Sequence, residues 1–402
     1  MENNLPEVRF PEFSESWNKV KLGDVFEQTS EYVNPKTKNL ELWSLTVEKG
    51  LTPKTDRYNR EFLVKKEDQF KAVSNNEFIY NPMNMTLGAV DLNLTGKQVA
   101  VSGYYTTMKT TDGYNSNYFN IWLKSPLAIK MYKAFATGSL IEKQRVQFPT
   151  LSQIKASVPL LDEQTKLGDF FKHLDQTIAF HTQELTTLKQ TKQGFLQKMF
   201  PKEGESVPKV RFSEFTESWV QSKLGEISNI VTGSTPSTSN KEYYCGNFLF
   251  VSPADMQGNR YVDATITTLS KKGFDKGRKI KSGSTLFVSI GSTIGKVAQN
   301  SKEVITNQQI NSVIPSEEMD EDFVFSLLEK HSTSIKKLSA IQAVPIINKN
   351  TFSNINIMYP TLEEQIKIGN FFKQFDDVIA LHQRKLDALK ETKKAFLQKM
   401  FV

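Results

Sequence analysis

The side chains in this sequence that could do chemistry are polar, lie in predicted loops, and suit recognition of a double-stranded nucleic acid. Asparagine and glutamine pair bidentately with adenine, arginine and lysine with guanine, and serine and threonine reach phosphates. Each loop alone is weak support, because polar loops in most proteins are only loops. The predicted contact residues are Tyr80, Asn84, Tyr104, Tyr105, Asn117 and Arg145 in the first half, and Ser234, Thr235, Ser237, Lys241, Tyr243, Arg278, Lys279, Ser292, Thr293, Lys296, Asn307 and Gln308 in the second.

Motifs of catalysis are missing from the sequence. Residues 291–296, GSTIGK, resemble a phosphate-binding loop, but three residues separate the glycines instead of four, and Val297 follows the lysine where Ser or Thr is needed. Asn81-Pro82-Met83 matches only part of the Asn-Pro-Pro-aromatic motif of adenine methyltransferases. Neither Gly-x-Ser-x-Gly nor His-Glu-x-x-His occurs. We therefore expect a binding protein with no catalytic residues, no metal and no cofactor of its own.

Length and composition limit the class of protein. The 402 residues can form two or three domains, and 38% hydrophobic with 24% charged residues is ordinary for a soluble chain. A net charge of +7 favours a polyanionic partner. The single cysteine, Cys245, excludes an internal disulfide and suits a reducing cytosol. Neither a signal peptide nor a run of about 20 apolar residues occurs, so we expect no membrane and a cytoplasmic location.

Two segments of the chain occur twice. Residues 159–200 recur as 360–401 with 24 of 42 positions identical, and residues 6–25 recur as 208–227 with 12 of 20 identical. The segments between them have nearly equal length but mostly different sequence, apart from short landmarks such as 85–90 and 292–297. This pattern predicts one scaffold that carries two diverged copies of one globular fold.

The longer repeat has a heptad pattern of apolar residues. Steps of four and three predict a long helix in each copy, and a period of 3.5 residues is typical of a left-handed coiled coil. The alternative is that each helix packs on its own globular domain. The predicted seam is Leu167, Phe171, Leu174, Ile178, His181, Leu185 and Leu188 in the first copy, and Ile368, Phe372, Phe375, Ile379, His382, Leu386 and Leu389 in the second.

Connectivity favours an antiparallel helix pair. The second globular segment begins soon after the first long helix ends, and it ends where the second helix begins, so both points should lie near that segment. A parallel pair would separate them by a helix length, about 55 Å. We expect one globular unit at each end of the pair, with pseudo-two-fold symmetry. His181 and His382 share a seam position; we favour a polar pair that sets the register, with a metal site or pH switch as the alternative.

The segments between the repeats are rich in β-branched and aromatic residues with Gly, Pro, Asn and Ser between them, which predicts short strands and long loops. The fold class is therefore α/β (α+β), with two similar globular domains and a pair of long helices that form an antiparallel intramolecular coiled coil. The predicted boundaries are 1–158 for the first domain, 159–200 for the first spacer helix, 201–209 for a linker, 210–357 for the second domain and 358–402 for the second spacer helix.

Short motifs occur at fixed places along the chain. They are PKVRF at 208–212 with Trp219 and LGEI at 224–227, the helix starts LDEQ at 161–164 and LEEQ at 362–365, FLQKMF at 195–200 and 396–401, TGSTPS at 232–237, and GSTIGKV at 291–297. In this order and duplication they resemble the specificity subunit of type I restriction–modification systems. The second domain fits the usual family pattern better than the first, which lacks a TGSTPS loop.

The resemblance implies that each globular domain is a target recognition domain, which reads one half of an asymmetric, bipartite site in double-stranded DNA. The helices would set the spacing and bind two methyltransferase (modification) subunits, and two restriction/translocase subunits would complete the complex. S-adenosylmethionine, ATP and Mg would be bound by those partners, which methylate adenine N6 and cleave DNA at the bacterial nucleoid in phage defence. The alternative is a coiled-coil scaffold that presents two protein-binding domains.

Overall fold

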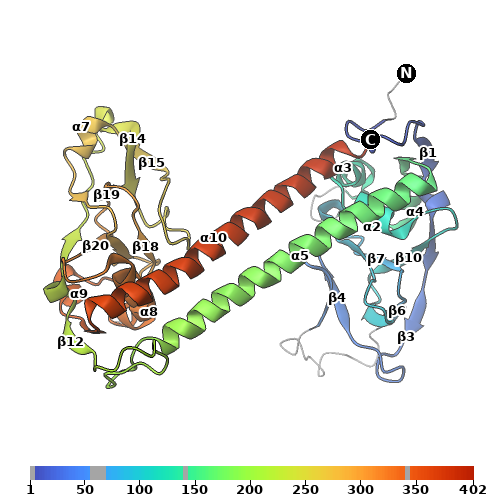
Figure 1. The fold of residues 1–402 in the computed structure, drawn as a ribbon. Coiled ribbons are helices and arrows are strands. Elements are labelled where there is room, and N and C mark those ends of the chain that lie inside the picture. Colours follow the sequence, from blue (N-terminus) through green and yellow to red (C-terminus); the bar gives the residue numbers. More distant parts are fainter. Residues whose placement is uncertain (1–4, 55–68, 139–143, 340–344) are drawn as a thin grey trace. The chain divides into compact units, whose positions relative to one another are not determined.

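The computed structural model describes residues 5–54, 69–138, 144–339 and 345–402, and the chain divides into two compact units. The first unit comprises Met1–Phe180 with Leu386–Val402, and the second comprises His181–Lys385. Each unit therefore contains the start of one long helix and the end of the other (Figure 1). Within the described residues, no helix has both the length and the apolar character needed to cross a membrane.

The two long helices are α5 (Leu161–Lys198) and α10 (Leu362–Lys399), each of 38 residues. Carboxylates in the first turn and a lysine in the last turn of each helix suit the helix dipole. Both helices lie where the repeated heptads predict them. None of the predicted seam residues is exposed.

The first unit is built on an antiparallel four-stranded sheet in the order β2–β10–β7–β8. The two-stranded sheet β4–β5 contacts β8, and the sheet β3–β6–β9 packs against β7 in a shared core cluster. The strands β1 and β11 pair and so join the two ends of the globular segment. The elements are β1 (Asn18–Lys21), α1 (Leu22–Val25), β2 (Phe26–Thr29), β3 (Glu31–Val33), β4 (Trp43–Thr46), β5 (Gly50–Pro53), β6 (Phe70–Val73), β7 (Phe78–Tyr80), η2 (Met85–Leu87), β8 (Val90–Leu92), β9 (Val99–Ser102), β10 (Thr106–Thr110), α2 (Ser116–Trp122), α3 (Pro126–Phe135), α4 (Phe148–Gln153) and β11 (Lys155–Val158).

The second unit has a sheet of the same construction in the order β13–β20–β17–β18, and β12 pairs with β21 as β1 does with β11. A further sheet, β15–β14–β19–β16, is mixed, since β14 and β19 are parallel. The elements are β12 (Val220–Lys223), α6 (Leu224–Ile227), β13 (Ser228–Thr232), η4 (Lys241–Tyr243), β14 (Tyr244–Val251), β15 (Thr267–Leu269), α7 (Lys271–Phe274), β16 (Lys279–Ile280), β17 (Thr285–Val288), β18 (Val297–Gln299), β19 (Val304–Thr306), β20 (Ile310–Pro315), α8 (Glu321–Lys337), α9 (Lys349–Ser353) and β21 (Asn356–Tyr359).

The sequence landmarks shared by the two halves are equivalent turns. Residues 85–90 connect β7 to β8, and residues 292–297 connect β17 to β18. Gly88 has φ +88° and Gly295 has φ +95°, a left-handed conformation that side chains with a Cβ rarely adopt. The two units therefore share one sheet topology and one turn chemistry, as expected for a duplicated fold.

Each unit's core combines the start of its own long helix with the end of the other helix. In the first unit Leu167 and Phe171 of α5 pack in the same cluster as Met400 and Phe401. In the second, the cluster contains Ile368 and Phe372 of α10 together with Leu196, Met199 and Phe200 from the end of α5.

The helix pair is thus antiparallel within each unit, as predicted. The ring centroids of Phe170 and Phe396 are 5.3 Å apart in the first unit, and those of Phe195 and Phe371 are 5.2 Å apart in the second. The alternative, packing of each helix on its own globular segment, also holds for the first turns of both helices. The apolar seam of each long helix therefore contacts both the other long helix and the globular segment that precedes it.

Candidate nucleic-acid interface

The repeated sequence motifs build an internal frame. Arg9 donates from Nε and Nη2 to the carboxylate of Glu163, at 2.7 Å each, and Trp17 donates to the same carboxylate at 3.2 Å. Arg211 and Glu364 repeat the two-bond pair at 2.7 Å. The PxVRF motif is thus clamped to the glutamate of each helix start, and its arginines are not available for DNA.

The glutamine after each glutamate fixes a second helix. Gln164 accepts from the backbone N–H of Asn115 at 2.9 Å, and Gln365 accepts from that of Asp320 at 3.1 Å. Asn115 and Asp320 are the N-cap residues of α2 and α8. Each glutamine also donates to the carbonyl of the proline five residues before it, at 2.9 Å. Both copies of the motif therefore position a domain helix against a long helix.

In the second unit, the structure brings the predicted residues of three separate segments together. Ser234 donates its backbone N–H to the carbonyl of Thr306 at 2.8 Å, and its hydroxyl accepts from the backbone N–H of Arg278 at 3.1 Å. The Arg278 guanidinium donates to the carbonyl of Thr232 at 2.9 Å, and Thr235 donates to the side chain of Gln308. The TGSTPS loop, the segment after α7 and the loop between β19 and β20 thus form one polar surface, called here the 232–308 surface.

Gly233 is the point where this surface depends on a missing side chain. A Cβ there would lie 2.1 Å from the Asn307 carbonyl oxygen and 2.4 Å from that of Thr306. Backbone atoms cannot yield that much space. The glycine therefore allows the first loop to lie directly on the loop that carries Asn307 and Gln308.

A basic segment that the prediction covered only in part adjoins this surface. Residues 271–281, KKGFDKGRKIK, carry six cations and one carboxylate, Asp275, which pairs with Lys271 at 3.0 Å and with Lys279 at 2.8 Å. These pairs lower the pKa of Asp275. Lys272 pairs with Glu242 at 2.9 Å. A charge run of this kind is typical of polyanion binding. The predicted contact residues include Arg278 and Lys279 of this run but not Lys271, Lys272, Lys276 or Lys281.

The remaining predicted residues of the second unit lie in the turn after β17, around η4 and at the end of the TGSTPS loop. Ser292, Thr293 and Lys296 belong to the turn after β17, beside residues 345–347, because Gly291 donates to the Pro345 carbonyl at 3.1 Å. Lys296 is exposed and its Nζ lies 3.4 Å from the carbonyl of Pro253. Ser237 and Lys241 are exposed and Tyr243 is half-buried, around η4.

The first unit presents fewer of its predicted residues. Tyr104 is 91% exposed between β9 and β10, Asn84 is exposed in the turn after β7, and Arg145 is exposed. The chain beside Arg145 reaches that turn, because Val146 donates to the Pro82 carbonyl at 2.9 Å. Tyr105 is half-buried, and its carbonyl accepts from Lys71 at 2.8 Å.

Two predicted contact residues of the first unit lie inside the protein framework: the prediction for Tyr80 is wrong, and Asn117 packs against α5. Tyr80 is fully buried in β7, a strand with neighbours on both sides and cores on both faces, so its ring cannot face DNA. Burial raises the pKa of its hydroxyl well above the usual value. Asn117 is half-buried in α2, where its Cβ is 3.0 Å from the position a Cβ would take on Gly168 of α5.

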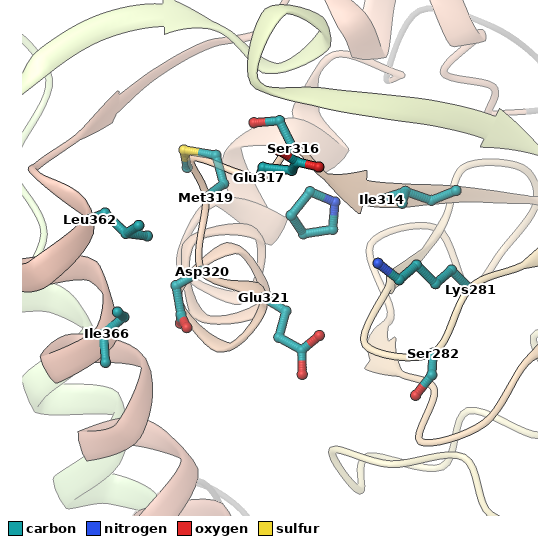
Figure 2. A pocket seen from close by; sticks show the side chains of 11 residues that line it. Lys281, Ser282, Ile314, Ser316, Glu317, Met319, Asp320, Glu321, Leu362 and Ile366 are labelled. Atoms are coloured by element: carbon teal, nitrogen blue, oxygen red, sulfur yellow. The ribbon is translucent and has the colours of Figure 1, made fainter.

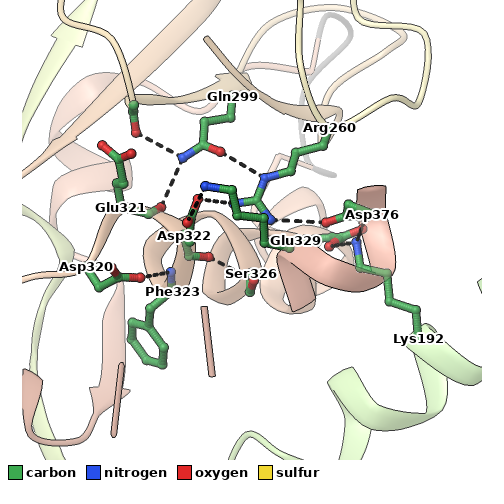
Figure 3. Close-up of polar contacts among 12 residues, drawn as sticks. Lys192, Arg260, Gln299, Asp320, Glu321, Asp322, Phe323, Ser326, Glu329 and Asp376 are labelled. Carbon is green, nitrogen blue, oxygen red and sulfur yellow. Dashed lines mark hydrogen bonds and ion pairs between the residues drawn. The ribbon is translucent and has the colours of Figure 1, made fainter. Parts of the chain in front are cut away.

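A buried charge network fixes a loop of the second unit to α8 and to the long helices (Figure 3). Arg260 donates to Asp322 of α8, to Gln299 at 2.9 Å and to Asp376 of α10 at 3.2 Å. Lys192 of α5 pairs with the same Asp376 at 2.6 Å and with Glu329 at 2.5 Å. Burial raises the pKa of Glu329, and Lys192 opposes this. Nothing in the sequence signals this network, since its members are far apart and follow no period.

Among its described residues, the first unit has the repeat equivalent of only one of these pairs. Lys393 pairs with Asp175 at 2.5 Å, which corresponds to Lys192 with Asp376, but this pair is more exposed. The second unit is therefore tied to the long helices by additional buried charges, among the residues that the structure describes.

A pocket of about 300 Å³ in the second unit has the wrong charge for DNA (Figure 2). Glu317, Asp320 and Glu321 line it with a single cation, Lys281, and Leu362 and Ile366 of α10 close one side. Burial raises the pKa of Asp320 and of Glu321. The pocket is therefore unsuited to a phosphate backbone and lies outside the candidate interface.

The chain matches the model of the type I restriction modification DNA specificity domain twice, over residues 14–190 and 216–391. The chain belongs to this family, because the two matches cover most of its length. Among curated proteins it is similar to the HindI specificity subunit of Haemophilus influenzae, with 33% identity over 229 residues, which are 54% of this chain and 50% of the relative. The MjaVIII specificity subunit of Methanocaldococcus jannaschii is 25% identical over 418 residues, 98% of this chain and 94% of the relative.

The chain spans about half the length of the first two curated relatives, 50% of one and 44% of the other.

Solved structures support the fold. A type I S subunit from M. genitalium has a TM-score of 0.69 at 14% identity, with 99% of each chain covered. A chain from a structure on the assembly and conformational transition of the type I R-M system has a TM-score of 0.53 at 18% identity, with 96% and 97% covered.

Proposed function

We propose that this chain is the non-catalytic DNA-recognition subunit of a type I restriction–modification complex. Each unit reads one half of an asymmetric, bipartite site in double-stranded DNA. The long helices bind two modification subunits, which carry the S-adenosylmethionine-dependent adenine methylation. Two restriction/translocase subunits that use ATP and Mg complete the complex, in the cytoplasm at the nucleoid.

One observation carries this proposal: the two units keep the same frame contacts but present different loops. The clamps Arg9–Glu163 and Arg211–Glu364 have the same atoms and lengths. By contrast, the 232–308 surface of the second unit has no counterpart among the described loops of the first, where Tyr104 is the most exposed large hydrophobic side chain. Two readers of the same sequence would have kept the same loops, so unlike loops favour a site with unlike halves.

Charge and side-chain type on the 232–308 surface agree with DNA as the partner. Amides and an arginine that can read base edges lie beside hydroxyls and lysines that suit phosphates. The basic segment 271–281 adds a salt-dependent attraction to any DNA sequence. A protein-binding scaffold would not require this combination.

The test is an exchange of one unit's interior between relatives. Replacing residues 26–154 retains β1, β11 and the Glu163 clamp in the recipient. The chimera is co-expressed with a modification subunit, and the methylated sequences of the host genome are determined. We expect one half of the methylated site to change and the other half to stay the same.

The reciprocal exchange of residues 228–355 is the matched control, and it should change the other half only. A methylome in which either exchange alters both halves, or neither, would contradict the assignment of one half-site to each unit. Absence of sequence-selective DNA retention by the assembled complex would favour the protein-binding scaffold instead.

A further inference from the structure

Two histidines and a glutamate from the long helices meet within the second unit. His181 and Glu184 lie one turn apart on α5, and His382 of α10 faces them. One donor atom from each residue lies within 4.8 Å of the other two. Nδ1 of His181 is 2.9 Å, and Nδ1 of His382 is 3.6 Å, from Oε2 of Glu184. The imidazole centroids are 5.9 Å apart.

The Glu184 carboxylate forms a hydrogen bond with the imidazole of His181 but not with that of His382. Nδ1 of His382 is buried and makes no hydrogen bond in the described parts of the chain, since 3.6 Å is too long for one. A buried nitrogen without a partner costs free energy. A group placed between the three donor atoms would remove that cost.

The carboxylate is also a departure from the repeat. His181 and His382 are equivalent positions, but Glu184 aligns with Lys385. A polar pair that only set the helix register would need no carboxylate at its centre. The acidic group is present on one helix alone, at the position that reaches both imidazoles.

We propose that His181, Glu184 and His382 bind one divalent first-row transition cation, with zinc the best fit. Two imidazoles and one carboxylate are a common ligand set for zinc, which takes water as the fourth ligand. Tetrahedral bonds of about 2.0–2.2 Å place ligand atoms about 3.3–3.6 Å apart, close to the separations of 2.9 and 3.6 Å here. The Glu184 side chain is 36% exposed, which leaves a path for the ion and its water.

A bound ion would join α5 to α10, because its ligands come from both helices. Its binding free energy would then add to the stability of the helix pair. This role is independent of DNA recognition, so its test can fail or succeed separately from the proposed function.

The test uses the full chain, freed of any affinity tag and treated with a chelator, in a Cys245→Ser background because that thiol is exposed. Cobalt(II) is titrated in, and its visible d–d absorption reports tetrahedral coordination. We expect one equivalent per chain, displaced by zinc and not by magnesium, which prefers oxygen ligands. Zinc should raise the melting temperature by about 5 °C or more.

Glu184→Gln and His382→Asn should each weaken cobalt binding by more than the roughly 10–100-fold that loss of an outer-sphere partner costs. His173→Asn is the matched control, since His173 is exposed on the same helix and should leave the titration unchanged. Circular dichroism of each variant shows that the helices are intact. An octahedral cobalt spectrum, or a tetrahedral one that survives His382→Asn, overturns the proposal and leaves the cluster as a hydrogen-bonded register pair.

Discussion

The guanidinium of Arg211 donates two parallel hydrogen bonds to the carboxylate of Glu364, each 2.7 Å long, and Glu364 is only 1% exposed. Charge-assisted bidentate pairs of this kind combine strength with a fixed geometry. The pairing also raises the pKa of Arg211, so the cation is retained. The pair joins the PxVRF motif, which precedes β12, to the start of α10. It thereby holds the two ends of the second globular segment together.

Breaking this pair should destabilise the second unit. Glu364→Gln removes the carboxylate charge and leaves Arg211 buried without its counterion, so we expect the free energy of unfolding of that unit to fall by about 3–5 kcal/mol. Hydrogen exchange of peptides from α8 and α10 measures the loss. Lys367 lies on the same helix as Glu364 and forms an exposed pair with Glu214. Lys367→Ala breaks that pair and should leave hydrogen exchange unchanged. Equal effects of the two substitutions would mean that burial of the clamp is unimportant.

The phenylalanines that follow the two long helices should each stabilise a different unit. Phe401→Ala opens a cavity in the core that contains Phe171, and Phe200→Ala opens one in the core that contains Phe323 and Phe372. We expect each to cost about 3–5 kcal/mol, the first seen as faster hydrogen exchange in β7 and α2 and the second in β17 and α8. Exchange that accelerated in the same unit for both variants would contradict the antiparallel arrangement.

Gly233→Ala should disrupt the 232–308 surface without unfolding the chain. The added methyl group would meet the carbonyl oxygens of Thr306 and Asn307, so the two loops must separate. We expect loss of one half-site from the methylated sequence of the assembled complex. Gly194→Ala is the control, because a Cβ there meets open space on α5 and alanine favours a helix. Retention of the full site by Gly233→Ala would exclude this surface from recognition.

Arg278→Ala should weaken sequence-specific DNA binding of the assembled complex by about 1–3 kcal/mol, because a bidentate base contact has that value. Binding is measured against salt concentration on specific and unrelated DNA. Arg384→Ala, on the exposed face of α10, is the matched control. If only the salt slope fell, by about one, and specificity remained, Arg278 would contact a phosphate.

His331 on α8 should make the second unit less stable in acid. Burial, with Lys330 nearby, lowers the pKa of His331 to about 4, below the usual value of about 6.5. The imidazole of His331 therefore binds a proton more readily in the unfolded chain than in the folded one. The contribution of neutral His331 to the free energy of unfolding is fully present above pH 6.5 and is lost as the pH falls toward 4. The loss is about 2–3 kcal/mol.

His331→Gln should flatten this part of the stability profile. Carboxylates also contribute to acid unfolding, so the informative quantity is the difference between wild-type and variant unfolding free energies from pH 7 to pH 4. A constant difference across that range would show that His331 does not titrate as its burial requires.

The long helices, their antiparallel direction and the duplication of the domains could be predicted because each leaves a periodic or repeated signal. Heptads and the identical LxEQ and FLQKMF segments are visible in the sequence alone. The Arg260 network leaves no such signal, because Arg260 is 62 residues from Asp322 and 116 from Asp376. Long-range polar partners are chosen by tertiary structure.

The error at Tyr80 has a related cause. All three residues of β7 are buried, since both faces of this strand are covered, so the strand lacks the alternation that distinguishes an inward side chain from an outward one. The residues predicted as contacts in the second unit lie together because the TGSTPS loop, the segment with Arg278 and the loop with Gln308 adjoin one another. The lysines around Arg278 become a candidate only through the summed charge of residues 271–281, because no single lysine of the run has a distinguishing neighbour.

The sharing of each core between distant segments has a consequence for synthesis of the chain. Lys399 pairs with Glu7 across 392 residues, and Met400 and Phe401 belong to the core of residues 17–171. The second unit has all its segments once residue 385 has left the ribosome, whereas the first, although translated earlier, still lacks part of its interior. We expect the half that is made first to finish folding last, and to expose apolar surface to chaperones in the interval.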